Sequence, residues 1–379
     1  MIIKNALVFN ESNQFEDNDI IIANDIIATS STGTVHDEVL DATGCYAIPG
    51  LTDLHFHGCV GYDFCDGTEE AFEAIAEYEA SQGITQICPA TMTFPEDTLI
   101  RIGQTAAAYK NESGAVLCGI NMEGPFLSYS KKGAQNASFL HAPDAAMFRR
   151  IQSASNNLIK LLDLAIEEPE ALDCIRELKN EVVLSIAHTN ATYEQAQAAI
   201  DAGITHVTHL YNAMSPYTHR SPGIIGAASD NDEVHVELIC DGIHIHPCVV
   251  RNTFKMFSDD RIILISDSMM ATGLKNGEYS LGGQAVTVTG NLATLHDGTI
   301  AGSATNLMDC VRVLVKDMKI PLESAIKCAA VNPAKEIGIF DQYGSISPGK
   351  KANIVLLNKD LSLRMVILNG RPFEQVTYK

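Results

Sequence analysis

The stretch Leu51-Thr52-Asp53-Leu54-His55-Phe56-His57-Gly58 decides how the rest of the chain is interpreted. Its first four residues form a candidate buried strand, and the two histidines follow where that strand ends. Side chains of an extended segment alternate between its two sides, so His55 and His57 point the same way. Such a pair either binds a metal or has ordinary hydrogen-bond partners in the core. Residues elsewhere in the chain distinguish these two interpretations.

Short apolar runs alternate with helical stretches from about residue 51 to residue 343. The expected strands are Leu51–Leu54, Ile84–Cys88, Val116–Asn121, Ile159–Ala165, Val182–Ala187, Thr205–Thr208, Val234–Cys240 and Ile262–Ser266. The expected helices are Glu69–Gln82, Glu96–Lys110, Ala145–Ser155, Pro169–Lys179, Tyr193–Ala202 and Leu307–Asp317. This alternation predicts an α/β fold of the (β/α)8 TIM-like barrel type. A doubly wound parallel sheet is the alternative, although it would usually have fewer strands.

The two chain ends differ from this middle region. Residues 1–50 and 344–379 contain short strand-like runs separated by turn residues, among them Ile2–Phe9 and Arg364–Leu368. We therefore expect one small β domain assembled from both ends, beside a catalytic barrel of residues 51–343. Gly277–Thr294, rich in Gly, Val and Thr, is expected to form a β-hairpin inserted before the last helices.

Polar residues of metal-ligand type follow six of the eight expected strands. They are His55 with His57, then Glu123, His188, His209, Asp241 with His244, and Asp267. In a barrel these strand ends meet at one mouth, where active sites lie. Taken singly, Glu123 could be a solvated acid in a loop, and His188 and His209 could be core histidines with ordinary partners. Asp267 alone could be the N-cap of the following segment. Taken together, they predict a metal site.

The predicted metal site combines imidazoles with carboxylates. That donor set suits Zn²⁺, Fe²⁺, Mn²⁺ or Co²⁺, and the sequence does not choose among these ions. A bound metal brings the pKa of its water toward about 7, so a carboxylate is an adequate base. Asp267 is accordingly expected to act as the general base and acid.

Composition limits the possible partners of the chain. A formal net charge of −21 and the absence of Trp argue against binding to nucleic acid or to an acidic membrane surface. Neither a basic signal peptide nor an apolar run of about 20 residues is visible. The ten cysteines are scattered and include no Cys-x-x-Cys pair, which is typical of reduced thiols. We therefore expect a cytoplasmic protein.

Several motifs resemble the N-acetylglucosamine-6-phosphate deacetylase family of the amidohydrolase superfamily, nearly end to end. They include Pro49–Asp53, Glu123–Phe126, Lys131–Ala134, His188–Ala191, Thr208–Met214, Arg220–Gly223, Asp241–His244, Gly302-Ser303, Asn332–Ala334 and Pro348–Ala352. The resemblance implies that the chain ends form a β-sandwich. It also implies that Glu123, His188 and His209 hold the principal metal and that Asp267 is the catalytic residue. The implied substrate-binding residues are Ala134, Gln135, Asn212, Ala213, Arg220, Asp241, His244, Ile300, Ala301 and Gly302.

The reaction implied by this resemblance is hydrolysis of N-acetyl-D-glucosamine 6-phosphate to glucosamine 6-phosphate and acetate. Arg220 would pair with the phosphate, and the subunits would form a homodimer in which phosphate-side residues reach the neighbouring site. Because His55 and His57 are both present, one or two metals per subunit are possible. Gln135 stands where a His is common in the family, and Ala165–Glu170 departs from the usual loop after the fourth strand. The alternatives are the galacto epimer, another amidohydrolase substrate, and a barrel that has lost catalysis and serves as a scaffold.

Overall fold

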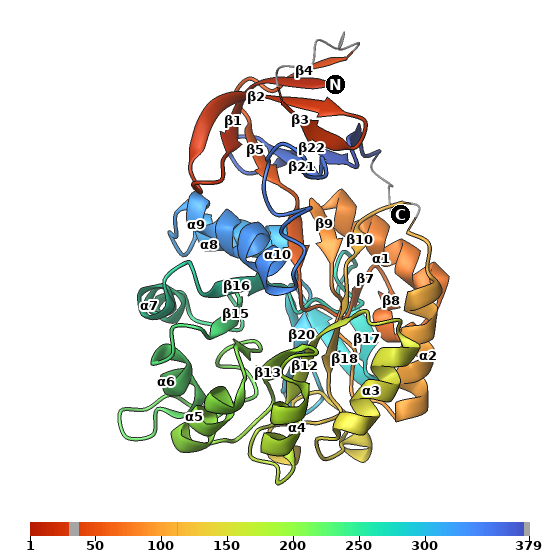
Figure 1. Cartoon of the computed structure of the whole chain (residues 1–379), viewed down its shortest axis with the longest axis vertical. Coiled ribbons are helices and arrows are strands. Elements are labelled where there is room, and N and C mark those ends of the chain that lie inside the picture. Colours follow the sequence, from red (N-terminus) through yellow and green to blue (C-terminus); the bar gives the residue numbers. More distant parts are fainter. Residues whose placement is uncertain (30–37, 112, 375–379) are drawn as a thin grey trace.

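The computed structural model describes residues 1–29, 38–111 and 113–374. Residues 30–37 and 375–379 of the expected small β domain, and residue 112 of the expected barrel, lie outside the described residues. Figure 1 shows a β-sheet at one end of the molecule and, below it, a larger body in which helices surround parallel strands.

The sheet at one end of the molecule combines strands from both chain ends, in the order β23-β22-β21-β5-β1-β2-β3, with β4 also paired to β1. Its strands are β1 (Ile2–Phe9), β2 (Phe15–Ala23), β3 (Ile26–Ala28), β4 (Val39–Asp41), β5 (Tyr46–Pro49), β21 (Ile354–Leu357), β22 (Leu363–Leu368) and β23 (Arg371–Pro372). The join is the antiparallel pair of β5 and β21, in which Ala47 faces Leu356. Both residues belong to a separate apolar cluster with Ile3, Val8 and Ile354.

The larger body contains two parallel sheets. One has the order β10-β9-β6, and the other the order β11-β12-β13-β14-β15-β16. Their strands are β6 (Leu51–Asp53), β9 (Ile84–Ile87), β10 (Val116–Leu117), β11 (Ile120–Glu123), β12 (Ile159–Leu164), β13 (Val183–Ile186), β14 (His206–Val207), β15 (His235–Ile239) and β16 (Ile262–Ile265). An isolated parallel bridge between Ala90 and Asn121 links the two sheets. The expected α/β alternation is confirmed.

Ten α-helices lie among these strands in the described part of the chain. They are α1 (Glu69–Ser81), α2 (Glu96–Ala108), α3 (Ala145–Ala154), α4 (Ala171–Leu178), α5 (Tyr193–Ala202), α6 (Gly223–Ser229), α7 (Pro247–Phe257), α8 (Leu307–Lys316), α9 (Leu322–Ile326) and α10 (Asn332–Glu336). Helix α5 begins at a capping box, because the side chain of Thr192 accepts from the backbone N–H of Gln195 while the side chain of Gln195 accepts from that of Thr192. Strands such as β16 are buried along their whole length, as a parallel strand covered on both faces requires.

One expected strand was wrong, and the expected β-hairpin forms but is part of a larger sheet. Residues 116–121 form two strands, because β10 pairs with β9 whereas β11 pairs with β12. Between them Gly119 approaches Lys160 so closely that a Cβ atom would lie 2.3 Å from its Cγ. The expected hairpin is a four-stranded antiparallel sheet of β17 (Gly277–Leu281), β18 (Gln284–Thr289), β19 (Leu292–Thr294) and β20 (Ile300–Ser303). The last two strands are too short to give a periodic pattern.

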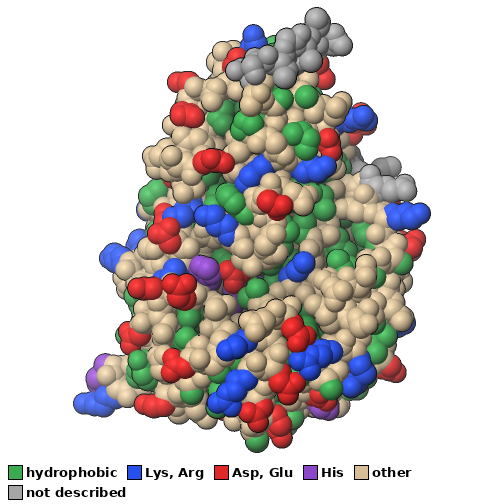
Figure 2. Space-filling model, viewed as in Figure 1, with side chains coloured by type: hydrophobic (Ala, Val, Ile, Leu, Met, Phe, Trp, Pro, Cys, Tyr) green, Lys and Arg blue, Asp and Glu red, His purple; other side chains and the backbone are tan. Residues whose placement is uncertain are grey.

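Within the described residues, no helix has both the length and the apolar character needed to cross a bilayer. On the face shown in Figure 2, acidic and basic side chains are interspersed. All ten cysteines are free.

Candidate active site and metal centre

Strand ends carry the predicted ligands to one place. His55 and His57 follow β6, Glu123 is the last residue of β11, and His188 and His209 come two residues after β13 and β14. Asp267 follows β16 in the same way. Parallel neighbouring strands end on the same side, which is why residues more than two hundred positions apart meet here.

Three of these residues have an unusual backbone. The φ angles of His188, His209 and Asp267 are 43°, 28° and 50°, in the left-handed region that residues other than Gly rarely occupy. Each lies two residues after the end of a parallel strand. Local strain of this kind concentrates at functional sites, where the surrounding structure holds it in place.

The carboxylate of Glu123 lies at the centre of the cluster. Its Oε1 atom is 2.8 Å from Nε2 of His188 and 3.3 Å from Nε2 of His209. The same atom is 3.7 Å from Nε2 of His55, while Oε2 is 3.5 Å from Nε2 of His57. All four imidazoles therefore point Nε2 toward one buried carboxylate.

Asp267 lies on the other side of the histidine pair. Its Oδ1 is 3.3 Å from Nε2 of His57 and 3.9 Å from Nε2 of His55. The side chain of Asp267 is 13% exposed, whereas those of Glu123 and the two histidines are at most 3% exposed. Among these groups, Asp267 is therefore the most exposed to the cavity.

The donor set fits a divalent transition metal. Nε2 of His188 and Nε2 of His209 are only 3.1 Å apart, and the buried Nε2 of His55 has no hydrogen-bond partner. Ligand atoms of His55, Glu123 and His209 lie within 4.8 Å of one another, and so do those of His55, His57 and Asp267. Converging imidazole nitrogens and carboxylate oxygens are the ligands such ions prefer.

Both carboxylates of the cluster favour the ionised form. Burial alone would raise the pKa of Glu123, but the charge of His55 and hydrogen bonds from His188 and His209 hold it well below its usual value. Burial also opposes ionisation of Asp267, yet the hydrogen bond from His57 and the charges of His55 and His57 lower its pKa. An ionised Asp267 is able to accept a proton.

A cavity of about 410 Å³ opens above these groups. Its lining includes most of the predicted residues, namely His57, Glu123, Ala134, Gln135, His188, His209, Asn212, Ala213, His244, Asp267, Ile300 and Gly302. The sequence analysis missed Met92, Ser130, Lys131, Gly133, Leu281 and Thr299, which also line it. Lys131 and Gly133 belong to the Lys131–Ala134 motif, so that motif could have identified them. No sequence motif contains Met92 or Leu281.

Three predicted substrate-binding residues do not line the cavity of this chain. Arg220 is exposed on the loop before α6. Ala301 is fully buried in an apolar cluster with Met269 and Leu281, because the alternation of β20 turns it away from the cavity. Asp241 lies behind His244, whose Nδ1 atom donates to Asp241 Oδ2 at 2.7 Å.

Gln135 contacts the metal cluster directly. Its Nε2 donates to Oε2 of Glu123 at 2.7 Å, and its Oε1 accepts from the backbone N–H of Thr93 at 2.7 Å. This amide therefore fixes the orientation of the Glu123 carboxylate as well as lining the cavity.

A buried network below the cluster was not anticipated from the sequence. Glu237 on β15 contacts His55 and His206, and Glu336 on α10 contacts His206 and His235. Although burial lowers the pKa of His206, the charge of Glu336 and the contact with Glu237 raise it to about 10. Burial opposes ionisation of Glu336, yet the charge and hydrogen bond of His206 lower its pKa to about 2. The network is therefore charged at neutral pH.

We expect Glu336→Gln to lower the free energy of unfolding by about 3 kcal/mol at pH 6, because the buried charge of His206 loses one of its two carboxylate partners and keeps only Glu237. The raised pKa of His206 adds stability that is complete below pH 6.5 and is lost as the pH rises to about 10. The difference between wild type and Glu336→Gln should therefore narrow over that window. Denaturant unfolding of both proteins at pH 6, 8 and 10 measures this difference in the free energy of unfolding. A difference that did not change with pH would contradict the ion pairing.

Comparison with known proteins identifies the class. A model of the amidohydrolase family matches residues 46–373, and the chain belongs to that family. N-acetylglucosamine-6-phosphate deacetylase from Bacillus subtilis (strain 168) is 35% identical over 380 residues, covering 98% of this chain and 96% of that protein. N-acetylgalactosamine-6-phosphate deacetylase from Escherichia coli O157:H7 is 30% identical over 375 residues, covering 98% of each.

A solved structure extends this likeness to the fold. It is that of a mutant N-acetyl-D-glucosamine-6-phosphate deacetylase from Mycobacterium smegmatis in complex with N-acetyl-D-glucosamine-6-phosphate. It superposes with a TM-score of 0.91 at 30% identity, covering 98% of this chain and 99% of that chain. The chain therefore has the amidohydrolase fold.

Proposed function

We propose that this chain is an N-acetylglucosamine-6-phosphate deacetylase, which hydrolyses the acetamide of N-acetyl-D-glucosamine 6-phosphate to D-glucosamine 6-phosphate and acetate. The observation that carries the proposal is the convergence of four imidazoles, Glu123 and an ionised, partly exposed Asp267 on one cavity. Likeness to deacetylases along nearly the whole chain supports the substrate class.

Glu123, His188 and His209 would hold the principal metal, and His55 and His57 would hold a second one where two are bound. A divalent metal at this site supplies Lewis acidity to the amide carbonyl and lowers the pKa of water. The choice among Zn, Fe, Mn and Co is left to metal analysis of the purified protein.

Asp267 would perform the proton transfers. Its carboxylate takes the proton of the attacking water and delivers it to the departing amine, which would otherwise leave as an unstable amide anion. His244, held by Asp241, would contact the sugar, and the backbone and side chains of Asn212 and Ala213 would orient the phosphate end. Ala134, Gln135, Ile300 and Gly302 line the same cavity.

Turnover of N-acetylglucosamine 6-phosphate beside N-acetylgalactosamine 6-phosphate tests the proposal. We expect release of acetate from both, with a higher kcat/KM for the gluco epimer. The galacto epimer is the second candidate, because a relative at 30% identity carries that name. A preference for the galacto epimer would favour that candidate, and absence of acetate release from either would contradict both.

We propose that Arg220 serves the cavity of a neighbouring subunit in a homodimer, since it is exposed and lies outside the cavity of its own chain. Loss of a charge-assisted contact costs about 1.5–3 kcal/mol, so Arg220→Ala should raise KM for the phosphorylated sugar by roughly 10–100-fold. KM for the unphosphorylated sugar should not change. Arg176→Ala, at an exposed site on α4, is the matched control.

Mixed dimers locate Arg220 relative to the site it serves. Arg220→Ala and Asp267→Asn chains, inactive or weakened alone, should recover about a quarter to a half of the activity when reassociated, because one site in the mixed dimer has both residues intact. Failure to recover activity in a verified mixed dimer would contradict service in trans.

We further propose that residues 51–343 form one closed (β/α)8 barrel and that residues 1–50 and 344–379 form a small β-sandwich domain. The barrel is supported by the backbone hydrogen bond from Asp267 to the carbonyl of His55, at 2.9 Å, which joins the end of the last strand to the end of the first.

The ten free cysteines support a reducing compartment such as the cytoplasm, and the net charge of −21 supports a small-molecule substrate rather than nucleic acid or an acidic membrane.

A further inference from the structure

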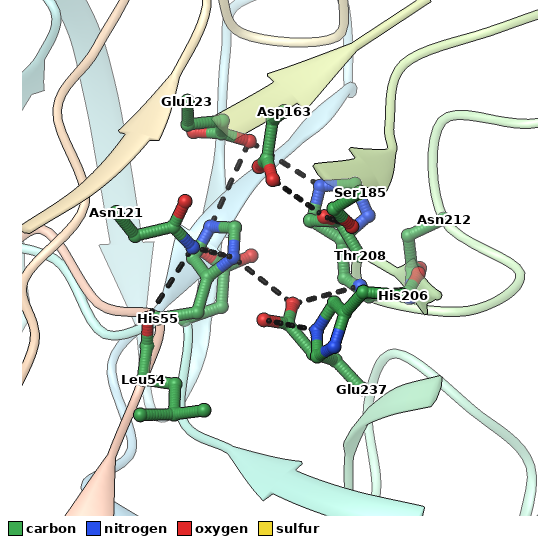
Figure 3. Close-up of polar contacts among 12 residues, drawn as sticks. Leu54, His55, Asn121, Glu123, Asp163, Ser185, His206, Thr208, Asn212 and Glu237 are labelled. Atoms are coloured by element: carbon green, nitrogen blue, oxygen red, sulfur yellow. Dashed lines mark hydrogen bonds and ion pairs between the residues drawn. The ribbon is translucent and has the colours of Figure 1, made fainter. Parts of the chain in front are cut away.

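The carboxylate of Glu237 lies directly behind the metal cluster, with none of its side chain exposed. Its Oε2 atom is 3.1 Å from Nδ1 of His55 and accepts from the backbone N–H of His209 at 3.1 Å. Figure 3 shows this carboxylate between the rings of His55 and His206. A single oxygen therefore contacts two of the expected ligand residues.

Glu237 is itself held from the side away from the cavity. Its Oε1 atom forms an ion pair with Nε2 of His206 at 3.2 Å. Nδ1 of His206 is 2.9 Å from Oε1 of Glu336, and Oε2 of Glu336 is 2.6 Å from Nδ1 of His235, at the start of β15. Only His235 is appreciably exposed, so the network runs from the cluster through the interior to the surface.

The contact with Glu237 determines which nitrogen of His55 can bind a metal. An ionised carboxylate only accepts hydrogen bonds, so Nδ1 of His55 must carry the proton. Nε2 is then the nitrogen with a free lone pair, and it faces Glu123 and Asp267. Asn121 Nδ2, 3.3 Å from the same Nδ1, donates instead to the carbonyl of Leu54 at 3.3 Å.

The four imidazoles differ in this support. Nδ1 of His188 donates to the carbonyl of Lys131 at 2.8 Å, whereas Nδ1 of His57 and Nδ1 of His209 have no hydrogen-bond partner among the described residues. His55 alone among the four has a carboxylate behind it. Burying the ion pair of Glu237 and His206 is costly compared with an apolar pair of similar size, so its presence calls for a role beyond packing.

We propose that Glu237, backed by His206 and Glu336, is a positioning residue that makes His55 a metal ligand by fixing the proton on Nδ1. The proposal rests on the proposed function, because it takes the cluster to be a metal site. The new element is Glu237, the residue on which metal binding by His55 depends. Loss of such a partner typically weakens metal binding by about 10–100-fold.

The test is a double-mutant cycle on zinc affinity, with His55→Gln, Glu237→Gln and the double variant. In Glu237→Gln an amide oxygen at the same position still accepts from His55 Nδ1 and from the backbone of His209, so the change removes only the negative charge that holds the proton on Nδ1. Zinc bound per chain is measured across a series of buffered free Zn²⁺ concentrations. We expect Glu237→Gln to weaken zinc binding by about 10–100-fold alone and by less than twofold once His55 has been replaced.

A second readout reports the coordination itself. Visible absorption of the Co²⁺-loaded protein should change in Glu237→Gln and should resemble that of His55→Gln. Glu79→Gln is the control for a buried Glu→Gln change, because Glu79 lies on α1 and is not among the groups that contact the cluster. Burial raises the pKa of the Glu79 carboxyl well above its usual value, so this substitution changes the side chain without removing a charge. Its zinc affinity and cobalt spectrum should match those of wild type.

The outcomes separate this proposal from the proposed function. Unchanged zinc affinity in Glu237→Gln, or an equal loss with and without His55, would overturn the positioning role while leaving deacetylation intact. Acetate release by wild type, measured in parallel, reports on the proposed function alone. A wild-type protein that bound none of Zn²⁺, Fe²⁺, Mn²⁺ and Co²⁺ would overturn both.

Discussion

Asp267→Asn is expected to lower kcat by about 10³-fold, within the range of 10²–10⁴ that a positioned acid or base contributes. The amide keeps the size of the side chain but cannot accept the proton of water. KM should stay within about threefold of wild type, because the cavity lining is otherwise unchanged. Acetate release at saturating substrate, with metal content measured on the same samples, gives both quantities.

Asp144→Asn is the matched control for this substitution. Asp144 caps α3 through hydrogen bonds to the backbone of Ala146 and Met147, and Asn is an equally good cap. The same chemical change there should leave kcat unaltered. Near-normal turnover by a metal-loaded Asp267→Asn protein would remove Asp267 from the role of base.

Glu123→Gln is expected to have the larger effect. Its carboxylate is in contact with all four imidazoles, so the neutral amide removes the one charge they share. Loss of a bound metal removes several kcal/mol of stabilisation from the transition state, which corresponds to a fall in kcat/KM on the order of 10³-fold or more. Metal content after dialysis and kcat/KM should fall together.

Excess metal in the assay distinguishes a weakened site from a lost one. If Glu123 is a ligand, added Zn²⁺ should restore part of the activity of Glu123→Gln, and the concentration needed should lie far above that of wild type. Retention of a full metal complement after dialysis would show that Glu123 is not a ligand. Glu79→Gln serves again as the control for a buried Glu→Gln change away from the cluster.

The sequence predicted which residues meet at the strand ends better than it predicted the boundaries of the fold. His55, His57, Glu123, His188 and His209 were recognisable because each ends or follows an apolar strand, and parallel strands bring such positions together. Helix bounds agreed closely where a cap or an amphipathic pattern marked them, as at Tyr193–Ala202. The four-stranded sheet after Gly277 was underestimated because its short strands depend on packing against Met92 and Met269.

The support of the cluster could not be read from the pattern. Glu237 lies inside an apolar strand, and Glu336 lies on a helix about 100 residues later, so nothing in their spacing links them to His55. Arg220 illustrates a different limit. The motif that contains it resembles a phosphate-binding segment, but the folded chain leaves it exposed, and the role we propose for it involves a second subunit.

The pairing of β5 with β21 has a consequence for how the chain matures on the ribosome. Tyr46–Pro49 leaves the exit tunnel some three hundred residues before its partner Ile354–Leu357 is made. Until then the N-terminal strands present an open edge with unpaired backbone groups, a surface prone to improper association. This sheet therefore closes last, after translation of the strands that carry the metal ligands. Slowing synthesis before residue 354 should prolong dependence on chaperones.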